Sequence, residues 1–187
     1  MPGQEKTTTE YDGRRTLIIG DVNTGKTRLT ANVLARWVTQ GRSKEIAVLD
    51  LAPETKETIG GRIHLPAGFR GAVLAATIVP PRLSGRDEVE ADTLAQANAA
   101  AIENLLKDSR LAHCPTLVIN DVTLYLQAGK YDHLWAVIQP VATVLINAYY
   151  GHSFPDYQLS RRERQLTDRL IQDCDRVIRL PIPDRHD

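Results

Sequence analysis

The chain has 187 residues, with 23 basic and 23 acidic side chains and therefore no net formal charge at pH 7. This length is typical of a single domain, and the charge balance argues against a protein that binds polyanions over its whole surface. Hydrophobic residues make up 42% and charged residues 25% of the chain, as in ordinary soluble globular proteins.

The N-terminal segment and the cysteines bear on the compartment. Residues 1–15 are polar and lack the apolar core of a signal peptide, and no apolar run reaches the roughly 20 residues that span a bilayer. Cys114 and Cys174 are far apart and show no metal-binding spacing, which favours reduced core cysteines. We therefore expect a cytoplasmic protein without membrane contact, whose residues 1–13 form a flexible tail.

Short apolar runs alternate with amphipathic segments along the chain. The apolar runs predict strands over residues 16–19, 45–51, 74–79, 116–120, 143–148 and 176–180. Helical spacing of apolar residues predicts helices over residues 26–40, 87–107, 131–141 and 160–173. Gly41 is expected to end the first helix, and Ser160 with Glu163 is expected to begin the last one as a capping box.

The predicted strands are continuous apolar runs rather than alternating ones. Such strands are buried on both faces, as in parallel sheets that helices cover on each side. With right-handed crossovers, this order of elements predicts an α/β three-layer sandwich with a mostly parallel sheet, in one domain over residues 14–183. Ligands of such sheets bind beyond the carboxyl ends of the strands, so the residues after each strand are candidates for the site.

The first predicted strand runs into the sequence GDVNTGKT, residues 20–27, which fits the pattern G-x-x-x-x-G-K-[ST] in full. Glycines let backbone N–H groups converge on a phosphate, and the following helix presents its positive end to the same anion. Lys26 supplies a charge for the β- and γ-phosphates, and the Thr27 hydroxyl is placed to bind Mg²⁺. The predicted nucleotide-binding residues here are Gly20, Asp21, Val22, Asn23, Thr24, Gly25, Lys26, Thr27 and Arg28.

On this motif and on its strand and helix flanks, the chain resembles the P-loop (Walker-type) NTPase superfamily, in its SIMIBI-like and P-loop kinase-like forms. The resemblance implies a P-loop NTPase sheet and a bound nucleotide with Mg²⁺. It also implies a second carboxylate near the metal ion, at the end of a buried strand.

Two aspartates follow predicted strands and are candidates for that role. Asp121 follows the strand over 116–120 and looks like a Walker B residue; the alternative is a helix-capping or turn aspartate. Asp50 ends the strand over 45–51, where related proteins place an acidic residue that contacts Mg²⁺, activates water or binds substrate; the alternative is a turn residue before Pro53. The predicted metal ligands are Thr27, Asp50 and Asp121, and the predicted catalytic residues are Lys26, Asp50 and Asp121.

The segment after the strand over 143–148 is where P-loop GTPases carry the loop that recognises the base. A guanine reader would show Asn-Lys-x-Asp, but the chain has Asn147 followed by Ala-Tyr-Tyr, so we expect ATP rather than GTP. Asn147 remains a candidate for hydrogen bonding to the base, and Tyr149 or Tyr150 for stacking on it. The alternative is an aromatic loop that packs against the fold.

Arginines gather in two places. Arg82 and Arg86 flank a turn, and Arg161, Arg162 and Arg164 stand near the start of the last predicted helix, where cations oppose the helix dipole. They suit an acidic partner or a transferring phosphoryl group; the alternative is a solvated face with local ion pairs. Residues 54–86 also contain Arg62, His64 and Arg70, which suit an anionic or nucleic-acid acceptor or a switch or dimer surface.

These features predict an ATP-binding P-loop NTPase that hydrolyses ATP or transfers its γ-phosphate with Mg²⁺, as an ATPase or a kinase-like phosphotransferase. The layout is loosely similar to that of polynucleotide-kinase domains, which combine a P-loop with a basic acceptor region. The alternative is a nucleotide-dependent switch or assembly subunit that controls a homodimer or a protein partner and has no metabolic substrate. The balanced net charge does not support a nucleic-acid partner.

Overall fold

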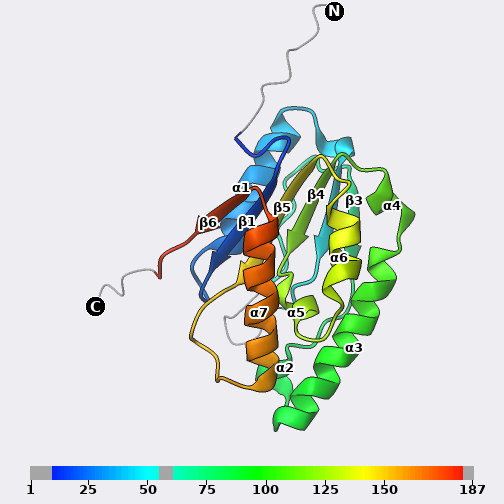
Figure 1. The fold of residues 1–187 in the computed structure, drawn as a ribbon. Helices are drawn as coiled ribbons and strands as arrows, with labels where there is room; N and C mark the ends of the chain where they lie inside the picture. Colours follow the sequence, from blue (N-terminus) through cyan, green and yellow to red (C-terminus); the bar gives the residue numbers. More distant parts are fainter. Residues whose placement is uncertain (1–9, 55–60, 183–187) are drawn as a thin grey trace, which may run out of the picture.

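The apolar runs of the sequence form one parallel sheet in the computed structural model, which describes residues 10–54 and 61–182 (Figure 1). The described strands are β1 (Arg15–Gly20), β2 (Ile46–Asp50), β3 (Ala72–Ala75), β4 (Thr116–Asn120), β5 (Thr143–Tyr149) and β6 (Arg176–Arg179). Their order across the sheet is β3-β2-β4-β5-β1-β6, and every neighbouring pair is parallel. The predicted α/β sandwich with a mostly parallel sheet is confirmed.

Helices cover both faces of this sheet. In Figure 1, α1 lies behind the sheet, whereas α3, α6 and α7 lie in front of it. The described helices are α1 (Lys26–Thr39), α2 (Pro81–Ser84), α3 (Glu88–Leu106), α4 (Ser109–Ala112), α5 (Thr123–Leu126), α6 (Tyr131–Ile138) and α7 (Gln158–Asp173), with a 3₁₀ turn over Ser43–Glu45.

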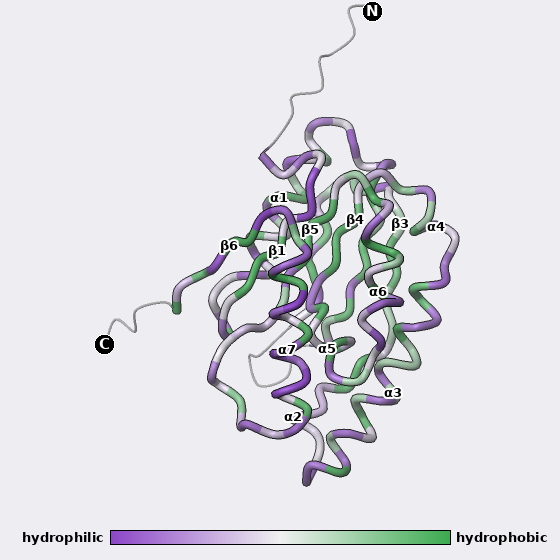
Figure 2. Tube along the Cα trace, in the orientation of Figure 1, coloured by the Kyte–Doolittle hydropathy of each residue, from purple (hydrophilic) through white to green (hydrophobic). Residues whose placement is uncertain are grey.

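The four central strands, β1, β2, β4 and β5, are buried on both faces because helices pack against each face, whereas the edge strands β3 and β6 are only partly buried. In β1, Leu17 and Ile19 belong to the core under α3, α6 and α7, whereas Ile18 belongs to the core under α1. Figure 2 shows the same pattern, with hydrophobic residues concentrated on the strands in the middle of the molecule. Burial on both faces explains why the sequence shows continuous apolar runs rather than alternation.

The N-terminal boundary differs from the expected one. Tyr11 is only 5% exposed and packs edge-on against the Trp37 ring of α1, at 6.5 Å between ring centroids. Asp12 accepts hydrogen bonds from Trp37 Nε1 at 3.1 Å and from Arg42 at 2.5 Å. The folded part therefore includes Tyr11, before the expected boundary at residue 14, while residues 1–9 and the expected end at 183 lie outside the described residues.

The start of the last helix was predicted wrongly. The helix α7 begins at Gln158 rather than at Ser160, and the Ser160 hydroxyl donates to the carbonyl of Pro155. Glu163 does not close a capping box, because its carboxylate instead pairs with Arg82. By contrast, α3 begins as predicted, with the side chain of Asp87 accepting a hydrogen bond from the backbone N–H of Glu90.

Two further predictions concern the strands and the membrane. The third strand, expected over residues 74–79, is shorter and covers Ala72–Ala75 at the edge of the sheet. Within the two described ranges, no helix is both long and apolar enough to cross a membrane.

The strand order decides which side chains meet at the carboxyl edge. The strand β5 lies between β1 and β4, so Asn147 of β5 stands between β1 and Asn120 of β4. In the same sheet, Asp50 of β2 is the register partner of Asn120. Polar strand ends far apart in the sequence therefore share one edge, which is where parallel α/β sheets bind ligands.

Candidate functional site

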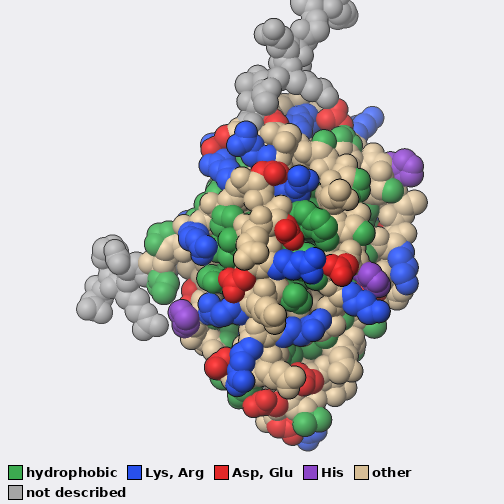
Figure 3. All heavy atoms as spheres, viewed as in Figure 1, with side chains coloured by type: hydrophobic (Ala, Val, Ile, Leu, Met, Phe, Trp, Pro, Cys, Tyr) green, Lys and Arg blue, Asp and Glu red, His purple; other side chains and the backbone are tan. Residues whose placement is uncertain are grey.

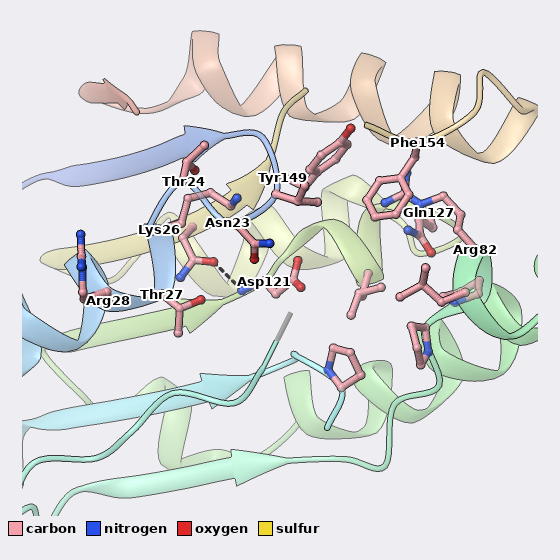
Figure 4. A pocket seen from close by; sticks show the side chains of 18 residues that line it. Asn23, Thr24, Lys26, Thr27, Arg28, Arg82, Asp121, Gln127, Tyr149 and Phe154 are labelled. Atoms are coloured by element: carbon pink, nitrogen blue, oxygen red, sulfur yellow. Dashed lines mark hydrogen bonds between the residues drawn. The ribbon is translucent and has the colours of Figure 1, made fainter. Parts of the chain in front are cut away.

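A cavity of about 580 Å³ opens at the carboxyl edge of the sheet. Every residue from Val22 to Arg28 lines it, together with Asp121, which directly follows β4, and Asn147 of β5 (Figure 4). The structure therefore brings most of the predicted nucleotide-binding residues to one cavity. Its size lies within the usual range for small-molecule sites.

The loop between β1 and α1 owes its shape to residues that tolerate a left-handed backbone. Asn23 has a φ of 56° and Gly25 a φ of 88°, a region that only glycine and a few polar residues adopt readily. A Cβ on Gly20 would lie 2.6 Å from the Thr24 hydroxyl oxygen, so the close turn requires glycine there. The loop thus wraps around the start of α1 as an anion-binding turn requires.

The N-terminus of α1 faces the cavity with its backbone donors uncapped. Gly25 precedes the helix, and no side chain of the described residues caps its first N–H groups. The first turn also lacks an acidic residue that would satisfy the positive end of the helix. An uncapped helix start of this kind favours a bound phosphate or carboxylate.

Lys26 reaches back across the loop. Its Nζ donates to the carbonyl of Asp21 at 2.5 Å, and the Thr24 hydroxyl donates to the same carbonyl at 2.9 Å. Burial lowers the pKa of Lys26, whereas the carboxylates of Asp121 and Asp21 act against this shift. An ammonium group partly stripped of water would be stabilised by a bound anion.

Asp21 holds the loop rather than facing a ligand. Its carboxylate accepts hydrogen bonds from the backbone N–H of Val22 at 2.6 Å and of His152 at 3.0 Å. Burial acts to raise the pKa of Asp21, but hydrogen bonds from Ser153, His152 and Val22 outweigh it and the pKa is lowered. A Cβ on Gly151 would lie 2.2–2.6 Å from this carboxylate, so glycine is needed for the approach. Asp21 therefore ties the loop between β1 and α1 to the segment after β5.

Asp121 lies directly after β4 and lines the cavity opposite the loop. Its φ is 58°, a left-handed value that aspartate adopts more easily than most residues. The Thr123 hydroxyl donates to its carboxylate at 2.5 Å. Burial raises its pKa, while the hydrogen bond from Thr123 and the charges of Lys26 and Arg82 oppose the rise. A desolvated carboxylate across from a lysine is suited to a metal ion or to proton transfer.

Asn120 joins the predicted residues into one network, although it was not among the predicted site residues. Its Oδ1 accepts from the Thr27 hydroxyl at 3.3 Å and from Asn147 Nδ2 at 2.8 Å. Its Nδ2 donates to Asp50 Oδ1 at 2.7 Å. Its position at the end of a predicted buried strand, directly before Asp121, could have indicated that Asn120 belongs to the site. Asn120 sets the position of the Thr27 hydroxyl at the cavity floor.

Asp50 is not in the cavity, contrary to the prediction. It is 4% exposed, and its carboxylate accepts from Asn120 and from the backbone N–H of Ile63 at 3.1 Å. Its connection to Thr27 runs through Asn120, because Asp50 and Asn120 are register partners on neighbouring strands. In this arrangement Asp50 orients the amide of Asn120 and does not reach a metal ion or a substrate directly.

Asn147 lines the cavity, but its amide is already used. Its Nδ2 donates to Thr30 Oγ1 at 2.9 Å and to Asn120 Oδ1 at 2.8 Å, and its Oδ1 accepts from the backbone N–H of Asp121. Both amide protons are therefore taken, and the residue lies inside β5 rather than in a loop beyond it. The predicted contact of Asn147 with a base does not fit this geometry.

The residues present fit a magnesium ion with few protein ligands. Magnesium usually keeps several waters and binds one or two protein oxygens together with substrate phosphates. Thr27 Oγ1 and the Asp121 carboxylate line the same cavity and supply such oxygens. Among the described residues, no group of three or more His, Cys, Asp or Glu side chains forms a metal cage.

The end of the cavity away from the loop contains a buried ion pair. Arg82 of α2 binds Glu163 of α7 at 3.1 Å, and the two side chains are 7% and 3% exposed. Gln127 Nε2 donates to Glu163 at 2.7 Å, and the Arg82 guanidinium lies 4.0 Å from the centre of the Phe154 ring. Gln127, Glu163 and Phe154 were not among the predicted site residues. The contacting residues come from segments far apart in the sequence, so no local sequence pattern could have predicted these contacts.

Four more of the arginines that the sequence singled out have partners within the chain. Arg86 pairs with Glu90 on α3, and Arg161 pairs with Asp156. Arg162 donates to the carbonyl of Gly129, and Arg164 lies over the Tyr150 ring. On the face shown in Figure 3, basic and acidic side chains are interspersed. These contacts match the alternative of local ion pairs and solvated arginines.

No protein-family model matches the chain, and a search of curated proteins finds no significant match.

Proposed function

We propose that the chain is an ATP-binding P-loop NTPase that, with Mg²⁺, hydrolyses ATP or transfers its γ-phosphate. The observation that carries the proposal is the Val22–Arg28 loop, which wraps an uncapped helix start and brings a partly desolvated Lys26 to the same cavity. Asp121 stands across this cavity from the loop and directly follows β4, which β5 separates from β1. Backbone donors, a lysine and a carboxylate at one cavity suit a nucleoside triphosphate with its metal ion.

Each residue has a role that follows from its chemistry. The loop N–H groups and Lys26 hold the phosphates and stabilise the negative charge that builds up on the transferring group. Thr27 and Asp121 would hold Mg²⁺, which neutralises charge between the β- and γ-phosphates when it is bound. Asn120 and Asp50 act behind Thr27 by fixing the orientation of its hydroxyl.

The reaction breaks the bond between the γ-phosphorus and the oxygen that bridges it to the β-phosphate. A new bond forms from the γ-phosphorus to the oxygen of water or of an acceptor hydroxyl, and the electron pair of the broken bond stays on ADP. The proton of the attacking O–H group leaves to solvent or to the phosphate product. Positioning and electrostatics supply most of the catalysis in such reactions.

ATP is proposed over GTP because the chain lacks the Asn-Lys-x-Asp guanine-recognition sequence after β5. The second candidate function is a nucleotide switch or assembly subunit that controls a second copy or a protein partner. It would use the same phosphate loop but would retain its nucleotide without turnover. Time courses of phosphate release distinguish the two functions, since a switch of this kind releases less than one phosphate per protein molecule over hours.

The test is a calorimetric titration of the protein with ATP and with GTP, with and without Mg²⁺. We expect ATP to bind with Mg²⁺ and GTP to bind more weakly. Lys26→Ala should weaken ATP binding by at least about 10-fold, the value of one lost charge-assisted hydrogen bond. Lys44→Ala, a lysine outside the cavity, is the matched control. Unchanged ATP affinity and turnover in Lys26→Ala would overturn the proposal.

A further inference from the structure

The cavity continues beyond the phosphate loop. In Figure 4, Arg28, Thr27 and Lys26 lie at one end, Asp121 lies in the middle, and Gln127, Phe154 and Arg82 lie at the other end. We call the part beyond Asp121 the distal half. The elements around it include α2 and α5 as well as the segment after β5.

The direction of a bound triphosphate follows from the proposed function, on which this inference rests. In the phosphate-loop motif the backbone cradles the α- and β-phosphates, while the lysine reaches the β- and γ-phosphates. Asp121, the carboxylate proposed for the metal ion, stands on the side of Lys26 that faces the distal half. The γ-phosphate therefore points toward the distal half, and the nucleoside leaves toward Arg28.

The walls of the distal half are mainly apolar. The lining residues on this side that carry no charge and no amide group are Pro53, Pro80, Pro81, Leu83, Leu124, Tyr149 and Phe154. Rigid proline and aromatic surfaces favour a flat or compact apolar group by burying it from water. Such walls offer no hydrogen bonds to phosphates or water, so the distal half favours a less polar molecule.

The charges around the distal half do not suit an anion. Arg82 is the cation at this end, and both terminal nitrogens of its guanidinium contact Glu163, which is itself buried. Arg62 of the neighbouring segment donates to Glu54 and to the carbonyl of Ala76. Among the described lining residues, no unpaired cation therefore remains on this side, and the carboxylate of Asp121 would repel an anionic ligand.

One polar group at this end lacks a partner within the described chain. Gln127 is 3% exposed, and its Nε2 donates to Glu163, while its Oε1 is buried and accepts no hydrogen bond. Buried acceptors are almost always satisfied, and each exception calls for a physical reason. This oxygen is shielded from solvent, so a ligand in the distal half would reach it only after the Gln127 side chain moved.

We propose that the distal half is a second subsite for an uncharged molecule with an apolar or aromatic body and a hydroxyl group. The apolar body packs against the prolines, Leu83 and Phe154. The hydroxyl oxygen lies on the γ-phosphate side, so this molecule is the acceptor class of a phosphotransferase rather than a nucleic acid or a sugar phosphate.

The experiment measures the binding of 2-naphthol, a neutral aromatic alcohol, and of naphthalene-2-sulfonate, its anionic counterpart of similar shape. Ligand-observed NMR titrations are made with the free protein and with the protein saturated with Mg²⁺ and the β,γ-imido analogue of ATP. We expect the dissociation constant of 2-naphthol to change by less than about 3-fold when the nucleotide analogue is present. The sulfonate should bind at least about 10-fold more weakly than 2-naphthol.

A pair of substitutions assigns the binding to the distal half. Leu83→Trp fills it without adding charge and should weaken 2-naphthol binding at least about 10-fold, with analogue affinity kept within about 3-fold. The matched control is Leu65→Trp, at a leucine that is 41% exposed and does not line the cavity. Phe154→Ala removes one wall and should also weaken 2-naphthol binding. Thermal unfolding of each variant shows whether it is folded.

Three results would overturn the subsite. The first is competition between 2-naphthol and the ATP analogue, which would place the nucleoside base in the distal half. The second is tighter binding of the sulfonate than of 2-naphthol. The third is that 2-naphthol does not bind to the nucleotide-loaded protein. Failure of the ATP analogue to bind at all would instead contradict the proposed function. In that case the subsite would still be tested by comparing the affinity for 2-naphthol of the free wild-type protein with that of Leu83→Trp.

Discussion

The two halves of the cavity are built in different ways. The phosphate-loop half comes from one continuous stretch, Val22–Arg28, whose shape is fixed by glycines and by the turn into α1. The distal half is assembled from α2, α5 and the segment after β5, and a buried ion pair between Arg82 and Glu163 joins α2 to α7. Local sequence therefore specifies the first half, whereas tertiary packing specifies the second.

The largest effect should come from breaking the ion pair of the distal half. Arg82→Met leaves Glu163 charged and buried with only Gln127 as donor, and should cost about 3–5 kcal/mol in the free energy of unfolding. Urea unfolding measures this loss. Arg86→Met is the matched control, because Arg86 is 88% exposed in its pair with Glu90 and should cost less than about 1 kcal/mol.

The double substitution Arg82→Met with Glu163→Leu sharpens this result. It removes both charges, so most of the stability lost in Arg82→Met should return. An equal cost for Arg82→Met and Arg86→Met would mean that the pair does not hold the distal half together.

The next largest effect concerns Asp121. Asp121→Asn removes the carboxylate proposed for Mg²⁺ and should lower ATP turnover by about 100-fold, as expected for loss of a metal-linked charge. Its stability should not fall, because burial raises the pKa of Asp121. Because the pKa of the carboxyl group is higher in the folded than in the unfolded chain, its ionisation lowers the free energy of unfolding at pH values above the pKa of the unfolded chain. Asparagine also tolerates the left-handed backbone at this position.

Phosphate release and urea unfolding test the two parts of this prediction together. Asp132→Asn, at an aspartate whose side chain is 81% exposed, is the control. Full turnover in Asp121→Asn would exclude Asp121 from the reaction, and a marked loss of stability would show that its charge is structurally required.

A smaller effect should follow at the anchor of the loop. In Gly151→Ala the new Cβ would lie 2.2–2.6 Å from the Asp21 carboxylate, so the two segments must separate. We expect a loss of about 1–3 kcal/mol in the free energy of unfolding, the usual cost of such overpacking. In an Asp21→Ala background, Gly151→Ala should lower the free energy of unfolding much less. If the losses of the two single substitutions instead add up in the double mutant, this would rule out the contact.

The smallest effect is a pH dependence of the same anchor. Hydrogen bonds lower the pKa of Asp21 against the effect of burial, so they stabilise the fold above the ordinary aspartate value of about 3.8. This contribution is lost as the pH falls through the lowered pKa of the folded state. The difference in unfolding free energy between the wild type and Asp21→Asn should therefore shrink below about pH 4. A difference that stays constant from pH 7 to pH 3 would contradict this account.

The sequence predicted the sheet and the loop because their signals are local. Each strand of the sheet is an apolar run, and the loop needs glycine at fixed positions, as Gly20 and Gly25 show. The position of Asp121 was predictable for the same reason, since it directly follows a buried strand.

The sequence did not predict contacts that depend on distant partners. Glu163 has the spacing of a capping box with Ser160, but Arg82, 81 residues away, binds it instead. Asp50 stands at a strand end like Asp121, yet Asn120 on the neighbouring strand occupies the space between it and Thr27. Only the strand order and register decide which of two similar aspartates faces the cavity.

The most direct test of the account is the backbone amide NMR spectrum of ¹⁵N-labelled protein during titration with Mg²⁺ and the β,γ-imido analogue of ATP. We predict that the resonances of Gly25, Lys26 and Thr27 shift most strongly, and that those of Leu83 and Gln127 shift much less. Saturating nucleotide that leaves the loop amides unchanged, or that shifts only residues of the distal half, would contradict the central claim that the loop half holds the phosphates.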